Sequence, residues 1–156
     1  MSITTEPTLN LKVKKWIKAP PARVFAAWTT PDQVRQWLGS KGNFSIASAK
    51  IDARPGGEYC FTAVSPQGEK VVRGTYREVN PPKRLVFTWS SNSSCSGAGG
   101  VSETLVTVDL VEIDGGTDVR ITHELFTSAE ARDQHNNGWT VCLDNLVQVL
   151  AGVKVL

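Results

Sequence analysis

The sequence predicts an α+β fold in which a curved antiparallel sheet of seven strands wraps around one long C-terminal helix. Segments of alternating apolar and polar residues recur through the middle of the chain, separated by turns rich in glycine and proline. Apolar residues three and four apart predict a helix from about 128 to 150 and two short helices after the first strand. With 156 residues, of which 40% are hydrophobic, we expect a single domain over 1–156 with an ordered core from about 9 to 152.

The first strand is predicted at 9–17, where apolar residues alternate with lysines in LNLKVKKWI. Beyond it the period changes to that of a helix, over 21–29 and again over 31–37. Pro31 suits the first turn of the second short helix, and Thr30 is a plausible N-cap residue for it.

Four turns divide the rest of the chain into strands: RPGG at 54–57, SPQG at 65–68, NPPK at 80–83 and DGGT at 114–117. The first suits a type II turn and the second a type I turn. Asp52 and Arg54 flank the first turn and are expected to pair across it, with little gain in stability if exposed. The stretch SSNSSCSGAGG at 90–100 predicts a mobile loop between two strands, for which a passive connector is favoured over a lid.

The last helix is predicted to begin with a capping box formed by Thr127 and Glu130. Its apolar stripe is spaced by three and four residues, and Gly152 follows as a C-terminal stop. One helix cannot fill the whole concave face of a seven-stranded sheet, so we expect a groove or cavity between helix and sheet.

Composition excludes several classes of function. The net charge is +2, and no stripe of basic residues with interleaved aromatics is present, so no nucleic-acid partner is expected. The three cysteines are far apart, which predicts neither a disulfide framework nor a zinc site. Without a signal peptide or a bilayer-spanning run, we expect a cytoplasmic protein with no membrane association. We found no phosphate loop, catalytic motif or metal-ligand set, so we expect no cofactor, no metal and no catalytic residue, and an enzyme is less favoured.

Strand parity indicates which side chains face the interior. His123 shares a face with Val119 and Ile121, so it should point inward. It could anchor a ligand, but a core histidine bonded to a neighbour is the favoured alternative. The candidates for lining a ligand cavity are mostly aromatic or aliphatic, and core packing is the default role of most: Tyr59, Phe61, Tyr76, Phe87, Trp89, Val108, His123, Trp139 and Leu143.

Five blocks carry a resemblance to a known family: IKAPPARVFAAWTTPDQVRQWLG, DARPGGEYCF, GTYREVNPPKRLVFTW, GGTDVRITHE and HNNGW. In this order, over about 11–150, they resemble the START-like helix-grip (SRPBCC) superfamily. The branch is the one similar to the C-terminal domain of the activator of heat shock protein 90 ATPase, in a stand-alone bacterial-type form. The resemblance implies the helix-grip fold. The superfamily spans carriers, hormone receptors, polyketide cyclases and co-chaperones, so it does not fix a function.

Within HNNGW, Asn136, Asn137 and Gly138 are poor helix formers inside a predicted helix. In the family that this chain resembles, the Gly-Trp pair lies where the last helix passes the mouth of the cavity. We expect Gly138 to permit a close approach to neighbouring structure, so that Trp139 turns inward and covers one end of the cavity. The alternative is a joint between two shorter helices.

Three functions follow as expectations. The first is binding of an apolar or aromatic small molecule between the sheet and the last helix. The second, implied by the resemblance, is a co-chaperone-like protein that binds and stimulates a chaperone ATPase. The third is a polyketide cyclase-like enzyme, which would need few catalytic groups if the pocket shapes a reactive chain.

Overall fold

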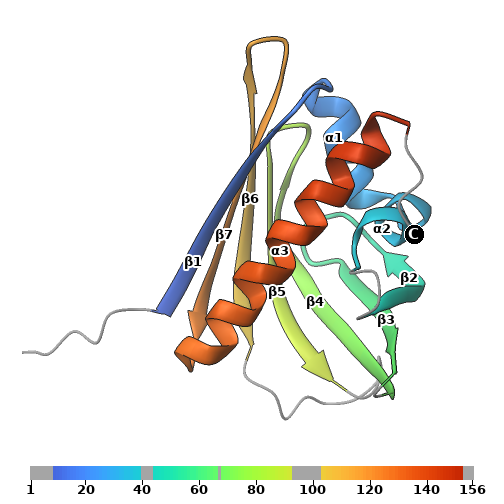
Figure 1. Ribbon diagram of the computed structural model, residues 1–156, viewed down its shortest axis with the longest axis vertical. Helices are drawn as coiled ribbons and strands as arrows, with labels where there is room; N and C mark the ends of the chain where they lie inside the picture. The colour runs from blue at the N-terminus through green and yellow to red at the C-terminus, as the bar shows by residue number, and fades with distance from the viewer. Residues whose placement is uncertain (1–8, 40–43, 67, 93–102, 153–156) are drawn as a thin grey trace, which may run out of the picture.

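The computed structural model describes residues 9–39, 44–66, 68–92 and 103–152. The elements run, in chain order, β1 (Leu9–Ile17), α1 (Pro21–Thr29), α2 (Pro31–Trp37), β2 (Ser45–Ile51), β3 (Glu58–Ser65), β4 (Gly68–Asn80), β5 (Arg84–Asn92), β6 (Thr104–Ile113), β7 (Gly116–Phe126) and α3 (Ala129–Leu150). Figure 1 shows the sheet curving around α3, and this confirms the predicted α+β helix-grip fold with two short helices after the first strand.

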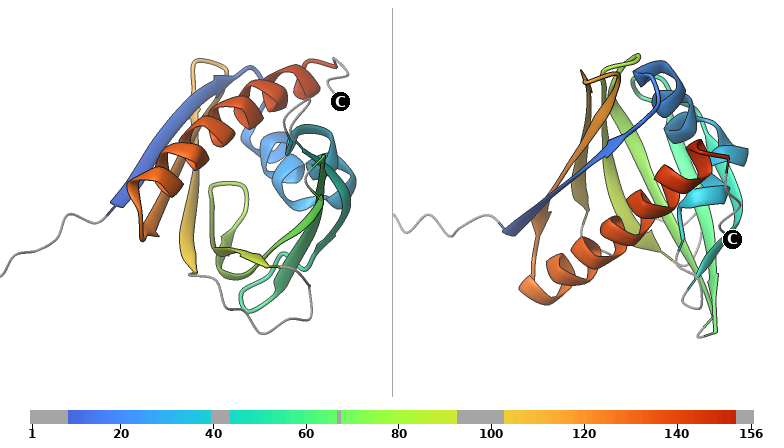
Figure 2. Two further views of the ribbon diagram at one scale, coloured as in Figure 1. Left: turned by 60° about the horizontal axis from the view of Figure 1, so that its bottom comes forward. Right: turned by 45° about the horizontal axis from the view of Figure 1, so that its top comes forward.

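The seven strands form one antiparallel sheet in the order β1-β7-β6-β5-β4-β3-β2. Strands β1 and β2 are consecutive in sequence yet lie at opposite edges, because α1 and α2 carry the chain from one edge to the other. Helix α3 packs mainly against β1, α2 and β7. The concave side of β2–β5 therefore receives less cover from α3, as the two views in Figure 2 make clear.

The turns follow their sequence signals. Gly57 N–H donates to the Arg54 carbonyl at 2.8 Å, and Gly56 has φ +83°, so the first turn is type II as predicted. The Asp52–Arg54 ion pair is also confirmed, at 2.9 Å and exposed. The predicted type I turn includes residue 67, which lies outside the described residues. In the predicted loop at 90–100, residues 90–92 belong to β5 and the rest lies outside the described residues.

The predicted cap of the last helix is wrong by one residue. The N-cap residue of α3 is Ser128, whose hydroxyl accepts from the Ala131 N–H at 3.1 Å. Thr127 lies in the bend between the end of β7 at Phe126 and the N-cap residue, so its hydroxyl is placed one residue too early to reach the free N–H groups of the first turn. Glu130 nonetheless lies in the first turn, where a carboxylate complements the helix dipole.

Cys60 takes part in a disulfide. The expectation of no disulfide framework is therefore wrong at this residue, because the fold can bring together cysteines that are far apart in sequence. Cys142 is a free, buried thiol. Within the described ranges, none of the three helices is both long enough and apolar enough to cross a membrane.

Candidate ligand pocket

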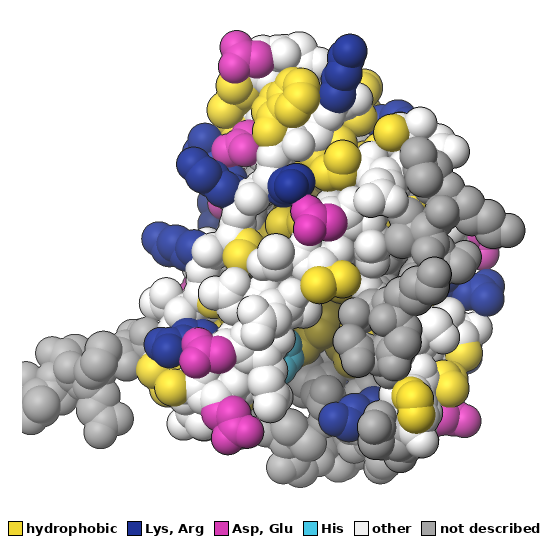
Figure 3. Space-filling view, in the orientation of Figure 1, with side chains coloured by type: hydrophobic (Ala, Val, Ile, Leu, Met, Phe, Trp, Pro, Cys, Tyr) yellow, Lys and Arg dark blue, Asp and Glu magenta, His cyan; other side chains and the backbone are white. Residues whose placement is uncertain are grey.

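An open pocket of about 510 Å³ lies between α3 and strands β2–β5. Most of its wall is apolar, and the polar residues come from the β3–β4 hairpin and the first turns of α3. The lining residues are Leu38, Phe44, Ile46, Ala63, Ser65, Gly68, Lys70, Val72, Trp89, Gln134, His135, Gly138, Trp139 and Cys142. Figure 3 views the molecule from this side, and hydrophobic side chains are visible in the hollow beside α3.

Deeper in the fold the aromatic side chains fill their own space. Tyr59, Phe61, Tyr76 and Phe87 line a second space of only about 20 Å³. The ring centroid of Tyr59 lies 4.9 Å from that of Phe61 and 5.4 Å from that of Phe87, within the range of packed aromatic pairs. These four candidates are therefore packed in the interior, and a ligand in the larger pocket would not touch them without a rearrangement.

Trp89 and Trp139 line both spaces. Their ring centroids are 5.2 Å apart, and with Leu38, which also lines both spaces, they form the wall between the deep aromatic cluster and the open pocket. Trp139 is 4% exposed, which confirms that it turns inward. Of the nine predicted candidates, these two tryptophans are the ones placed in the wall of the open pocket. Val108, His123 and Leu143 are completely or almost completely buried and line neither space.

His123 is held by protein groups on both ring nitrogens. Trp139 Nε1–H donates to His123 Nδ1 at 3.1 Å, and an indole nitrogen can only donate, so Nδ1 is unprotonated. The proton is then on Nε2, which donates to Thr104 Oγ1 at 2.7 Å, and Thr104 in turn donates to the Trp89 carbonyl at 2.9 Å. Burial, and then the neighbouring His135, lower the pKa of His123 to about 3. A neutral His123 thus links Trp139, through hydrogen bonds, to Thr104 of β6, and Thr104 is bonded in turn to Trp89.

His135 lines the pocket but is not among the predicted candidates. Its Nδ1 donates to the Ala131 carbonyl at 2.7 Å, and its ring centroid is 6.4 Å from that of Trp89. A signal was available, because residues 135, 138, 139 and 142 share one face of α3 and all line the pocket. Lys70 is also absent from the predicted candidates. Its parity on β4 puts it on the same face as Val72, but a lysine in a strand suggests a solvent-exposed position.

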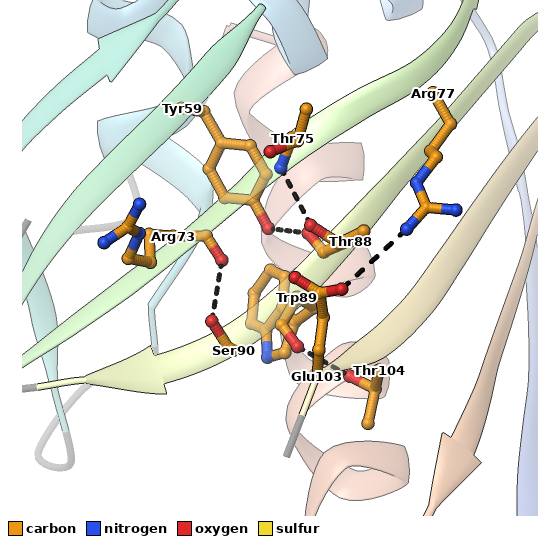
Figure 4. A network of polar contacts seen from close by, with 9 residues as sticks. All are labelled: Tyr59, Arg73, Thr75, Arg77, Thr88, Trp89, Ser90, Glu103 and Thr104. Atoms are coloured by element: carbon orange, nitrogen blue, oxygen red, sulfur yellow. Dashed lines mark hydrogen bonds and ion pairs between the residues drawn. The ribbon is translucent and has the colours of Figure 1, made fainter. Parts of the chain in front are cut away.

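The pairing of β4 with β5 is interrupted between Arg73 and Tyr76, and Figure 4 shows the polar contacts that Tyr59, Thr75 and Thr88 make there. The Tyr59 hydroxyl donates to the Thr88 carbonyl at 2.5 Å, and the Thr75 N–H donates to the Thr88 hydroxyl at 2.8 Å. A Cβ at Gly74 would overlap the Thr88 carbonyl and meet the Tyr59 ring, so glycine is needed here for close approach. Burial raises the pKa of Tyr59 well above its usual value and keeps its hydroxyl a donor.

The close approach predicted at Gly138 is wrong. A Cβ built on Gly138 would meet nothing within 4 Å outside the helix's own adjacent backbone, because the residue faces the open pocket. The alternative joint is also wrong, since α3 is continuous from Ala129 to Leu150. Glycine at this position leaves the pocket wider than any other residue would.

Cys142 lines the pocket and is held as a neutral thiol. Burial raises the pKa of the Cys142 thiol to about 11, and the thiol donates weakly to the Gly39 carbonyl, so a thiolate is disfavoured. Among residues 9–39, 44–66, 68–92 and 103–152, histidine, cysteine and carboxylate side chains do not gather in groups of three or more that could hold a metal ion.

Solved structures of bacterial proteins share this fold. A protein from Chromobacterium violaceum is 24% identical, with a TM-score of 0.79 over 90% of this chain and 96% of its own. A protein from Silicibacter pomeroyi described as AHSA1 is also 24% identical, with a TM-score of 0.78 over 92% of this chain and 98% of its own. For a Rhizobium leguminosarum protein the identity is 27% and the TM-score 0.74, over 90% and 92% of the two chains. Comparison with curated proteins gives no significant match.

The sequence profile of one family matches residues 18–151, from the end of β1 to the residue after α3. That range contains α1, α2, the remaining six strands and the whole of the helix that borders the pocket. The chain therefore belongs to the family described as Activator of Hsp90 ATPase homolog 1-like protein.

Proposed function

We propose that this protein binds a mainly apolar small molecule in the pocket between α3 and strands β2–β5. The supporting observation is the pocket itself, whose volume of about 510 Å³ falls in the range of small-molecule sites. Its wall combines two tryptophans and several aliphatic side chains with a few polar groups at one end, which is the usual composition of such sites. The site is a revision of the predicted one, since Tyr59, Phe61, Tyr76 and Phe87 pack behind Trp89 and Trp139.

Gly138 supports the same proposal. A glycine in the interior of a helix costs roughly 1 kcal/mol relative to alanine, and no close contact requires it here. The open pocket in front of it gives a reason for a small residue, because any side chain at this position would extend into the space that a ligand would occupy.

The test compares two substitutions on adjacent residues of α3. Gly138→Leu places a side chain in the pocket, whereas Asn137→Leu places the same side chain on the exposed face. Both raise helix propensity, by up to roughly 1 kcal/mol, so neither should unfold the protein. Binding of Nile red, a neutral hydrophobic dye, is measured by its own fluorescence and by the change in the protein's tryptophan fluorescence, to which Trp89 and Trp139 contribute.

We expect the parent protein and Asn137→Leu to bind the dye with equal affinity, and Gly138→Leu to bind it roughly tenfold more weakly, about 1.4 kcal/mol. Equal affinity in all three proteins would place the dye elsewhere and contradict the proposal. So would the absence of binding by the parent protein to Nile red and to a panel of apolar and aromatic compounds.

Stimulation of a chaperone ATPase and polyketide cyclisation stay predictions, as does a cytoplasmic location. The Cys142 thiol is held neutral and both ring nitrogens of His123 are bonded to protein groups, so binding is the function that the geometry favours over catalysis.

A further inference from the structure

The polar residues of the pocket are gathered at one end. Ser65 and Lys70 come from the β3–β4 hairpin, and Gln134 and His135 come from the second turn of α3. The lining residues elsewhere are apolar or glycine. A ligand that filled this space would therefore have an apolar body and one polar end.

Lys70 lies on the concave face of the sheet. Along β4 it shares parity with Val72, Gly74 and Tyr76, and across the ladder it is paired with Ala63, which is 8% exposed. A lysine is an unexpected residue on a face that is otherwise built for burial, where its aliphatic stem can cover apolar surface while its ammonium stays at the rim.

The charge of Lys70 has no counterpart in the pocket. No carboxylate is found among the pocket-lining residues, and within the described residues Lys70 forms no ion pair with an acidic side chain. The adjacent Glu69 is on the opposite face of β4, by strand alternation. The ammonium is thus free to pair with a charge that a ligand brings.

We propose that the ligand is an amphipathic anion, with an apolar body in the pocket and a carboxylate at Lys70. This inference rests on the proposed function and specifies its ligand class. The Gln134 amide, which makes a long contact of 3.5 Å to Glu130, lies at the same end and can add a hydrogen bond to the head group.

The test uses ligands with one apolar body and three head groups: dodecanoate, dodecanol and dodecyltrimethylammonium, each below its micelle-forming concentration. Each displaces Nile red from the parent protein and from three variants. Lys70→Met keeps the stem and removes the charge, and Lys70→Arg keeps the charge. Lys12→Met removes an exposed charge from β1, away from the pocket.

We expect the parent protein to bind dodecanoate about fivefold more tightly than dodecanol, about 1 kcal/mol for an ion pair at a partly open site. This preference should be lost in Lys70→Met, retained in Lys70→Arg and unchanged in Lys12→Met. Dodecyltrimethylammonium should bind most weakly to the parent protein.

The outcomes separate the two proposals. If Nile red and all three amphiphiles fail to bind, the proposed function is wrong. If they bind but dodecanoate has no higher affinity than dodecanol, or if Lys70→Met retains the higher affinity for dodecanoate, the anionic ligand class is wrong. The proposed pocket is not contradicted by that result.

Discussion

His123 is a buried titratable residue with a structural role, because both of its ring nitrogens are hydrogen-bonded to protein groups. If Nδ1 were protonated, it and the Trp139 indole nitrogen would both be donors, and the hydrogen bond between them would be lost. The favoured alternative of the sequence analysis, a core histidine bonded to its neighbours, is what the geometry supports. Its consequence is a dependence of stability on pH.

The pKa of His123 is about 3 in the folded protein and about 6.5 in the unfolded chain. Between these values only the unfolded chain holds the proton, so acid favours unfolding and stability rises with pH across this interval. From pH 7.5 to 5.5 the contribution of His123 to the free energy of unfolding should fall by about 1.4 kcal/mol. Urea unfolding of the parent protein and of His123→Gln at both pH values checks this. An equal loss in both proteins would contradict it.

Gly74 has close neighbours, whereas a Cβ at Gly138 would meet nothing within 4 Å, so alanine substitutions at the two positions should have opposite effects on stability. Gly74→Ala should destabilise the protein by about 1–3 kcal/mol, because its methyl group collides with the Thr88 carbonyl and the Tyr59 ring. Gly138→Ala should instead stabilise it, by up to about 1 kcal/mol, because the helix gains propensity and the methyl group meets open space. Denaturant unfolding measures both changes. A destabilising Gly138→Ala would restore the close approach that the structure rules out.

At the scale of the elements, periodicity is a local property, which is why strands and helices were predictable. Pro21 and Pro31 begin the two short helices at the residues expected from the sequence. The start of α3 was not predictable, because Thr127 and Ser128 are both good N-cap residues. Which of them caps the helix depends on the residue at which β7 ends, and the pairing of β7 with β1 and β6 sets that residue.

The cap can be tested by two alanine substitutions on adjacent residues. Ser128→Ala removes the hydrogen bond to Ala131 N–H and should cost about 1 kcal/mol in the free energy of unfolding. Thr127→Ala, at an exposed position outside the helix, should change stability by less than about 0.5 kcal/mol. A larger cost for Thr127→Ala would mean that the capping box predicted from the sequence forms in solution.

The candidate site was predictable only in part. Alternation shows which face of a strand a side chain occupies, and it correctly turned Tyr59, Phe87 and His123 inward. Alternation does not show how much space remains once those side chains have packed. The open pocket is therefore displaced toward the β3–β4 hairpin and residues 134–142, where Gly138 and Lys70 matter and the larger aromatics do not.

For the whole molecule, the position of the pocket follows from an imbalance between sheet and helix. Seven strands curve around a single long helix, and that helix packs mainly against β1, α2 and β7. The short helices and the aromatic cluster cover much of what is left, and the open pocket occupies the remainder beside β2–β5. The family resemblance seen in the sequence is confirmed, and with it the helix-grip fold.

The strand order also determines when each part of the sheet can form during synthesis of the chain. Lys12 of β1 is paired with Thr122 of β7, about 110 residues further along the chain. During synthesis β1 would leave the ribosome long before β7, the strand with which it pairs, exists, and α3, which packs against β1, is made later still. Contacts of such separation slow folding, so the N-terminal strand should be the last part of the sheet to acquire protection from hydrogen exchange as the new protein folds.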